Sequence, residues 1–145
     1  MKNFVHKFDF MHQYDDYSCG RVCAYMVTAN LGGKVSRRWL RYLLNTDMYR
    51  GTPQKNLVTA LRSFGYSCNV MSHGALRDIK NYLQRGYLAI ACVDDNMHWI
   101  VVRGFGKGRV YVADPWPLNP KYHTLEKFNE RIKHGSVIFV RRNEK

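Results

Sequence analysis

The chain has 145 residues and a mass of 17.0 kDa, the size of one ordinary domain with room for a hydrophobic core. Hydrophobic residues make up 46% of it and aromatic residues 14%, which excludes a disordered chain. Lysine and arginine outnumber aspartate and glutamate by 23 to 11, and the net charge of +12 suits an acidic protein, an anionic membrane or nucleic acid as a partner. Because the basic residues are scattered, we interpret them as solvated helix faces.

The first half of the chain predicts helices, preceded by an arm or edge strand in the first dozen residues. Apolar residues at helical spacing predict a first helix from about residue 18 to residue 30, and Gly32 and Gly33 end it. Ser36 is the expected N-cap of a second helix over residues 37–45. The apolar stripe of this second helix is expected to comprise Trp39, Leu40, Leu43 and Leu44.

Three further elements lead to the middle of the chain. Gly51, Thr52 and Pro53 predict a turn, an N-cap and the first residue of a third helix. Residues 66–71 predict a short strand, and residues 75–84 predict a fourth helix.

The second half changes to the pattern of strands. Residues 87–93 (YLAIACV) form a continuous apolar run, which is typical of a buried central strand. Residues 98–115 predict a hairpin, because two β-branched and aromatic runs flank a glycine-rich segment around Gly106. Thr124 caps a last helix, and residues 136–142 (SVIFVRR) complete the sheet.

This order of elements predicts an α+β fold in a single domain that spans residues 1–145. The N-terminal helices are expected to pack on a C-terminal antiparallel β-sheet, as two layers that face each other. We expect the functional site in the cleft between these layers.

Cys19 is the strongest candidate for a reactive side chain. It stands at the first turn of the first predicted helix, where backbone N–H groups and the helix dipole favour a thiolate. Gln13, six residues earlier, can bring a side-chain N–H to the point where an acyl oxygen would become negative, although a lone glutamine is more often a surface residue. Cys23, Cys68 and Cys92 lie in apolar or strand-like runs and fit buried structural thiols.

His98 and Asp114 are the candidates for completing a triad with Cys19. Each alone has a plainer interpretation, a strand-end histidine and a turn aspartate. The two positions are symmetric about Gly106, so a hairpin loop of odd length places them directly opposite, with Cβ atoms about 4.5–5.5 Å apart. An acid at that distance fixes the tautomer of the imidazole. A loop of even length would spoil this register, and the sequence leaves both open.

The cysteines and the N-terminal sequence indicate a reducing compartment. The first ten residues lack the apolar core of a signal peptide, and no apolar stretch is long enough to cross a bilayer. We therefore expect a cytoplasmic protein with reduced thiols. Cys19, Cys23 and His98 lack a fourth zinc ligand at a recognisable spacing, so we expect neither a metal nor a cofactor.

Together these motifs resemble the papain-like cysteine peptidases that process double-glycine leader peptides of bacteriocins and related secreted peptides. The resemblance covers nearly the whole domain. Its motifs are a Gln six residues before a Cys-Gly pair, a Gly-Thr start of a mid-domain helix, a His-Trp strand start and an Asp-Pro after the next strand. In this sequence they begin at Gln13, Cys19, Gly51, His98 and Asp114.

The resemblance implies a peptidase with Cys19 as nucleophile, His98 as general base, Asp114 as its orienting acid and Gln13 as oxyanion donor. It implies cleavage of a peptide or protein after small, Gly-Gly-like residues, and it makes a membrane peptide exporter a candidate partner. Ser18 departs from the family, which usually has Asp before the cysteine. Many members are also joined to an exporter, whereas this sequence carries no transporter.

Three alternatives stay open on the sequence alone. The same triad serves deamidation, transglutamination and other acyl transfer, because fold and triad do not fix the acceptor. A non-catalytic module of the same fold could grip a peptide or an acidic partner, and the presence of Cys19 counts against it. Nucleic-acid binding rests on the charge alone, without a recognition motif, and ranks last.

Overall fold

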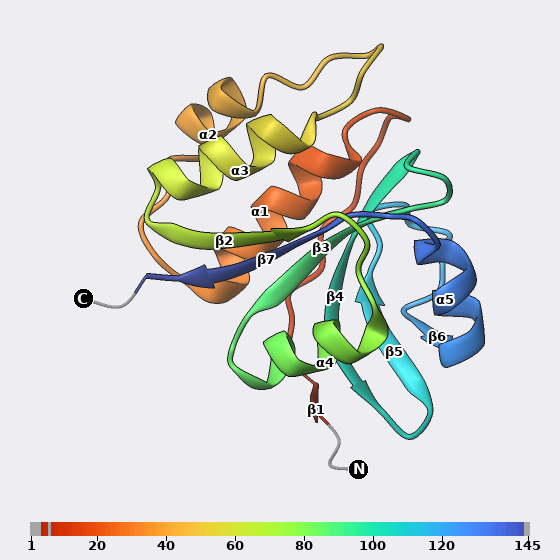
Figure 1. The fold of residues 1–145 in the computed structure, drawn as a ribbon. Coiled ribbons are helices and arrows are strands. Elements are labelled where there is room, and N and C mark those ends of the chain that lie inside the picture. The colour runs from red at the N-terminus through yellow and green to blue at the C-terminus, as the bar shows by residue number, and fades with distance from the viewer. Residues whose placement is uncertain (1–3, 6, 144–145) are drawn as a thin grey trace.

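The computed structural model describes residues 4–5 and 7–143 (Figure 1). The predicted helices and strands are present within three residues of their expected bounds, and β6 is an addition. Among the described residues, no helix is long and apolar enough to span a membrane. In chain order the elements are β1 (Phe4–Val5), α1 (Cys19–Leu31), α2 (Arg37–Leu44), α3 (Gln54–Ser63), β2 (Tyr66–Met71), α4 (Leu76–Gln84), β3 (Leu88–Val93), β4 (His98–Gly106), β5 (Arg109–Ala113), β6 (Tyr122–Thr124), α5 (Leu125–Ile132) and β7 (Val137–Arg142).

The strands form one antiparallel sheet in the order β2-β7-β3-β4-β5-β6, and β1 pairs with the far end of β4. The apolar run that forms β3 is buried at every residue and lies between β7 and β4, so the predicted central strand is confirmed. The last strand in the sequence, β7, is inserted between β2 and β3. This insertion joins the helical half of the chain to the hairpin half.

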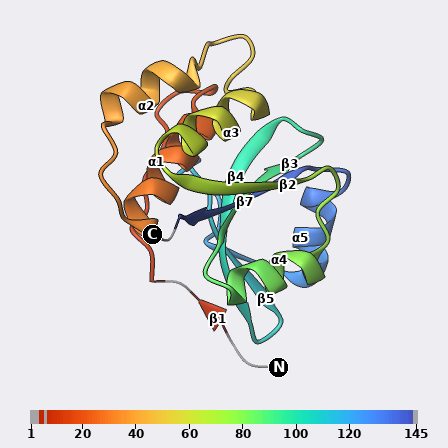
Figure 2. The ribbon, with the colours of Figure 1, turned by 60° about the vertical axis from the view of Figure 1, so that its left-hand side comes forward.

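Helices cover both faces of the sheet (Figures 1 and 2). On one face, α1, α2 and α3 bury a core together with alternate residues of β3, β4 and β7. On the other face, α4 and α5 cover the intervening residues of the same strands. The predicted α+β architecture, with N-terminal helices on an antiparallel sheet, is confirmed, and α4 and α5 add a thinner layer behind it.

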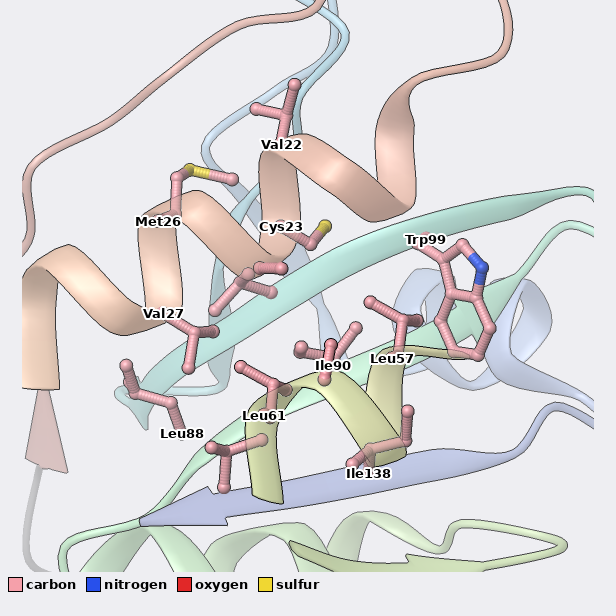
Figure 3. Packing of buried hydrophobic residues seen from close by; sticks show 14 of the residues in the cluster. Val22, Cys23, Met26, Val27, Leu57, Leu61, Leu88, Ile90, Trp99 and Ile138 are labelled. Atoms are coloured by element: carbon pink, nitrogen blue, oxygen red, sulfur yellow. The ribbon is translucent and has the colours of Figure 1, made fainter. Parts of the chain in front are cut away.

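The core beneath α1 fixes the position of its first turn. Figure 3 shows Val27 of α1 and Leu61 of α3 packed toward Leu88 and Ile90 of β3, whereas Met26 projects from the other side of α1 within the same buried cluster. These side chains are at most 1% exposed, and each buried aliphatic side chain contributes roughly 1.5–3 kcal/mol. The axis of α1 is therefore held against the sheet by its middle turns, which leaves its N-terminus at the end of β4.

Two local expectations are wrong. The predicted stripe of α2 is narrower, because Leu40 and Leu44 are buried while Trp39 is 60% and Leu43 37% exposed. This eight-residue helix packs on α3 and α1 with one buried residue per turn. Thr52 does not cap α3: Pro53 is the N-cap, and the Thr52 hydroxyl hydrogen-bonds that of Thr46 at 2.6 Å.

The β4–β5 hairpin differs from the predicted register and still brings its two ends together. Its loop has two residues, Lys107 and Gly108, with φ of 53° and 73°, as in a type I′ turn. This even-length loop alone would put His98 and Asp114 on opposite faces. A β-bulge between Val102 and Gly104 shifts the pairing by one residue and restores a common face. His98 and Asp114 are consequently diagonal neighbours and not the directly opposite pair expected.

Candidate active site

The first turn of α1 presents Cys19, which is 7% exposed. Asp15 prepares this turn, because its Oδ1 accepts hydrogen bonds from the backbone N–H of Tyr17 at 3.0 Å and of Ser18 at 2.7 Å. Ser18 is the N-cap residue but makes no side-chain cap, so the hydrogen bonds of Asp15 order the turn before the helix and do not cap it. Cys19 thus begins the helix at the positive end of its dipole, as the sequence predicts.

A close contact holds the start of α1 against β4. A Cβ atom on Gly20 would lie 2.8 Å from Cβ of Thr52 and 3.0 Å from Cδ1 of Trp99, so only glycine fits. Trp99 follows His98 on β4, and its Nε1–H donates to the carbonyl oxygen of Thr52 at 3.1 Å. The absence of a side chain at residue 20 therefore lets Cys19 approach the first residue of β4.

His98 and Asp114 are in direct hydrogen-bonding contact. His98 Nε2 lies 2.7 Å from Asp114 Oδ1, and the side chains are 16% and 1% exposed. Because a carboxylate oxygen only accepts, Nε2 carries the hydrogen, which leaves Nδ1 for the Cys19 thiol. Cys19 is also a hydrogen-bond partner of His98. The structure thus brings together the three residues that the sequence singled out.

The pKa of His98 reflects these two partners. Burial lowers it, but hydrogen bonds with Asp114 and Cys19 and the charges of both raise the pKa from 6.5 to about 9. For Asp114, burial raises the pKa, and the hydrogen bond and charge of His98 outweigh it, so the net pKa is lowered. The thiolate is the nucleophilic form of a cysteine, and an imidazolium beside the sulfur favours the thiolate near neutral pH. The neighbouring carboxylate in turn stabilises the imidazolium.

Four donors surround the Asp114 carboxylate. Oδ1 accepts from His98 and from the backbone N–H of Trp116 at 2.9 Å. Oδ2 accepts from Asn119 Nδ2 at 2.8 Å and from Arg131 Nη1 at 3.3 Å. Both oxygens are saturated, so the plane of the carboxylate is fixed.

Gln13 is buried beside this site, with 3% of its surface exposed, so the surface interpretation does not hold. Its backbone N–H donates to the carbonyl oxygen of Pro115 at 2.8 Å, which ties the N-terminal arm to the residue after Asp114. Its side-chain Nε2 donates to the carbonyl oxygen of Asp15 at 2.7 Å. That bond uses one of the two amide hydrogens, and the amide lies on the loop that leads into Cys19.

The other cysteines are inert thiols. Burial raises the pKa of Cys23 well above its ordinary value, and burial raises the pKa of both Cys68 and Cys92 to about 11. All three are buried in the core, as the sequence predicts. Within the described residues, no group of three or more His, Cys, Asp or Glu side chains could hold a metal ion.

Arg131, Asn119 and Asp94 belong to the site but were missed by the sequence analysis. Asn119 stands in an irregular segment after Asp114, and Arg131 looks like one more basic residue of a solvated helix face. Its side chain is in fact only 9% exposed. An arginine is recognised as buried only from its neighbours in space, and no local pattern carried that information.

A groove of about 440 Å³ adjoins the site along the N-terminal arm and α1. Gln13, Asp15 and Ser18 line its end nearest Cys19. Its walls are apolar and basic and are formed by Phe10, Met11, Arg21, Val22, Tyr25, Arg37 and Arg41, among others.

The fold is shared with solved peptidase domains. One similar structure is a double glycine motif protease from an AMS/PCAT transporter in complex with the leader peptide, with a TM-score of 0.77 and 20% identity over 97% of this chain and 99% of that one. Another is the peptidase domain of Streptococcus ComA, a bifunctional ABC transporter involved in quorum sensing, with a TM-score of 0.76 and 21% identity over 94% and 100% of the chains.

A third similar structure is the N-terminal peptidase C39 like domain of the toxin secretion ATP-binding protein from Vibrio parahaemolyticus. It has a TM-score of 0.66 and 15% identity, over 87% of this chain and 98% of that one. No curated protein matches the chain significantly. At these identities the likeness establishes the fold.

The fold and the cysteine at the helix start define a papain-like cysteine peptidase domain. The model of the peptidase C39 family matches residues 7–145, so the chain belongs to that family and is a cysteine peptidase.

Proposed function

We propose that this peptidase acts through Cys19, His98, Asp114 and Gln13 and cleaves a peptide after small, Gly-Gly-like residues. The observation that carries the proposal is the 2.7 Å contact between His98 and Asp114 at the start of β4, beside the cysteine that begins α1. The oriented imidazole and the helix start then act on one thiol.

In the reaction, the Cys19 sulfur attacks the carbonyl carbon of the scissile peptide bond, and His98 holds the thiol proton on Nδ1. The oxyanion that forms accepts a hydrogen bond from Gln13 and from the backbone N–H at the start of α1. His98 transfers its proton to the leaving amine, the C–N bond breaks, and a thioester remains on Cys19. His98 then takes a proton from water, which attacks the thioester and releases the acid and the thiol.

The family and the groove support the proposed substrate class. The double glycine motif protease among the similar structures was solved with a leader peptide. In this chain, the groove beside Gln13 and Ser18 offers apolar walls and the cations of Arg21, Arg37 and Arg41. We propose that it holds the segment that precedes the cleaved bond, with acidic and apolar side chains.

The setting of the protein is part of the same proposal. Two of the similar structures are named as parts of transporters, an AMS/PCAT transporter and the ABC transporter ComA, which supports a membrane peptide exporter as partner. The free, buried cysteines among the described residues are consistent with the reducing cytoplasm. The family match over residues 7–145 supports one peptidase domain along the chain.

The test is selective alkylation of thiols in the folded protein. Iodoacetamide at about neutral pH should label Cys19 much faster than Cys23, Cys68 or Cys92, because burial raises the pKa of those three thiols. Cys19→Ser should abolish cleavage of a double-glycine peptide and leave the melting temperature nearly unchanged. Equal, slow labelling of all four cysteines would contradict the proposal and favour a non-catalytic binding module.

A further inference from the structure

Arg131 is a buried cation in the last turn of α5, and every acceptor it contacts belongs to the surroundings of the triad. Its Nε and Nη2 donate to the two carboxylate oxygens of Asp94 at 2.9 and 2.7 Å. Its Nη1 donates to Asp114 Oδ2 at 3.3 Å and to His123 Nε2 at 3.0 Å. Burial lowers the pKa of Arg131, but hydrogen bonds and charge interactions with Asp94 and Asp114 outweigh burial and raise the pKa overall. The side chain therefore stays charged.

Asp94 connects Arg131 to the segment that precedes His98. It opens the β3–β4 turn, in which Asp94, Asp95 and Asn96 all have φ between 56° and 66°. Three consecutive left-handed residues are costly unless their surroundings hold them in place. The Asp94 side chain is held by the guanidinium, and its backbone N–H donates to the carbonyl oxygen of Arg131 at 2.8 Å.

Arg131 therefore contacts both supports of the imidazole, the turn before His98 and the carboxylate that accepts from it. It also sets the charge beside His98. With Arg131 in place, the two aspartates and the guanidinium sum to one negative charge, and without it they sum to two. The titratable and charged groups that face this network among the described residues are Cys19 and Cys23 of α1, Cys92 of β3, His98 of β4, Asp94, Asp114, His123 of β6 and Lys127 of α5.

We propose that Arg131 is a positioning residue of the triad, which fixes the Asp114 carboxylate and the turn before His98 and sets the pH range in which the Cys19 thiolate forms. The inference rests on the proposed function. His123 takes part as a neutral acceptor, because burial and the Arg131 charge lower its pKa. The guanidinium suits this role because its planar group of N–H donors reaches acceptor atoms on three residues, Asp94, Asp114 and His123. An ammonium group cannot hold three such residues in a fixed geometry.

The experiment measures the rate of Cys19 alkylation by iodoacetamide against pH. Arg131→Gln removes a cation, so the rise in rate should move to higher pH by about one unit. Asp94→Asn removes an anion, so the rise should move to lower pH. Arg131→Lys should keep the rise near its wild-type pH but lower kcat by about tenfold, because the ammonium does not hold Asp94, Asp114 and His123 together.

Two features keep the result decisive. Lys133→Gln removes an exposed cation just beyond the same helix and should leave the profile in place. Asp94→Asn suits a position with positive φ and serves if Arg131→Gln does not fold. In Arg131→Gln and Asp94→Asn, the alkylation rate could fall by a constant factor at every pH, without a shift of its rise along the pH axis. That result would reduce Arg131 to a structural residue and overturn the inference. If wild-type Cys19 is no faster than the other thiols, the proposed function itself fails.

Discussion

At the scale of single residues, the Asp114 carboxylate accepts hydrogen bonds from four different residues. Each of its oxygens accepts from two donors, His98 and Trp116 on one side and Asn119 and Arg131 on the other. An amide of the same shape has only one oxygen, so it satisfies only one of these sides. The arrangement thus demands a carboxylate, although the neutral Asn has the same size.

Asp114→Asn should consequently fold but lose activity. If the amide oxygen faces Asn119 and Arg131, the amide nitrogen donates toward His98 and forces its wrong tautomer. We expect kcat to fall by about 10²–10⁴-fold. The measurement is steady-state cleavage of a double-glycine peptide, with melting temperature as the control for folding. A variant with full kcat would exclude Asp114 from the triad.

Gln13→Ala tests the oxyanion role. The loss of the amide donor should lower kcat by about 10²–10³-fold, with little change in KM. Alkylation of Cys19 by iodoacetamide forms no oxyanion, so its rate should stay within a factor of two or so of wild type. If alkylation falls together with kcat, Gln13 acts through the Asp15 loop that positions Cys19, and the oxyanion assignment is wrong.

At the scale of elements, the contact between α1 and β4 and the bulge in the hairpin place the site. The bulge between Val102 and Gly104 brings Asp114 to the same face as His98 after a two-residue turn that would otherwise separate them. Gly20 lets α1 come within van der Waals distance of Thr52 and Trp99. Neither element carries chemistry, yet each decides where a reactive group lies.

Gly20→Ala tests the helix contact. The added Cβ would lie 2.8 Å from Thr52 Cβ, so the backbone has to move, and overpacking of this kind costs about 1–3 kcal/mol. We expect a lower melting temperature and a kcat reduced by at least about tenfold, because Cys19 moves with the helix. Ala29→Ser, at an exposed position of α1, is the matched control and should change neither quantity. Wild-type stability for Gly20→Ala would show that the contact is not tight.

At the scale of the whole molecule, segments that lie far apart in the chain meet at one site. The N-terminal arm and α1 supply Gln13 and Cys19, the hairpin supplies His98 and Asp114, and α5 supplies Arg131. The site is therefore complete only when α1 packs against β4 and α5 packs against β5. Its ionisation is consequently linked to the free energy of unfolding.

The pH dependence of stability follows from His98. Its folded pKa of about 9 lies above its ordinary value of 6.5, so the pairing stabilises the folded state fully below pH 6.5. This stabilisation is lost as pH rises through about 9. We expect the difference in unfolding free energy between wild type and His98→Ala to shrink by on the order of 1–3 kcal/mol from pH 6 to pH 10, by urea denaturation. If this difference in unfolding free energy did not depend on pH, the pKa of His98 would not be raised in the folded protein.

The sequence determined the elements and singled out the candidate reactive groups. Helical and alternating apolar periods marked the helices and strands, since these depend on residues near one another in the chain. The helix start marked Cys19 for the same reason. Four short motifs in order pointed to the family that the chain belongs to.

Tertiary structure decided what depends on residues far apart in the chain. A one-residue bulge has no local signature in VVRGFG, yet it sets which face Asp114 occupies. The burial of Arg131 depends on Asp94 and Asp114, which lie 37 and 17 residues away. Trp39 and Leu43 satisfied the helical period but remained exposed, because no element of the described part of the chain covers that side of α2. Periodicity specifies which face can be buried, and only the packed neighbours determine whether it is.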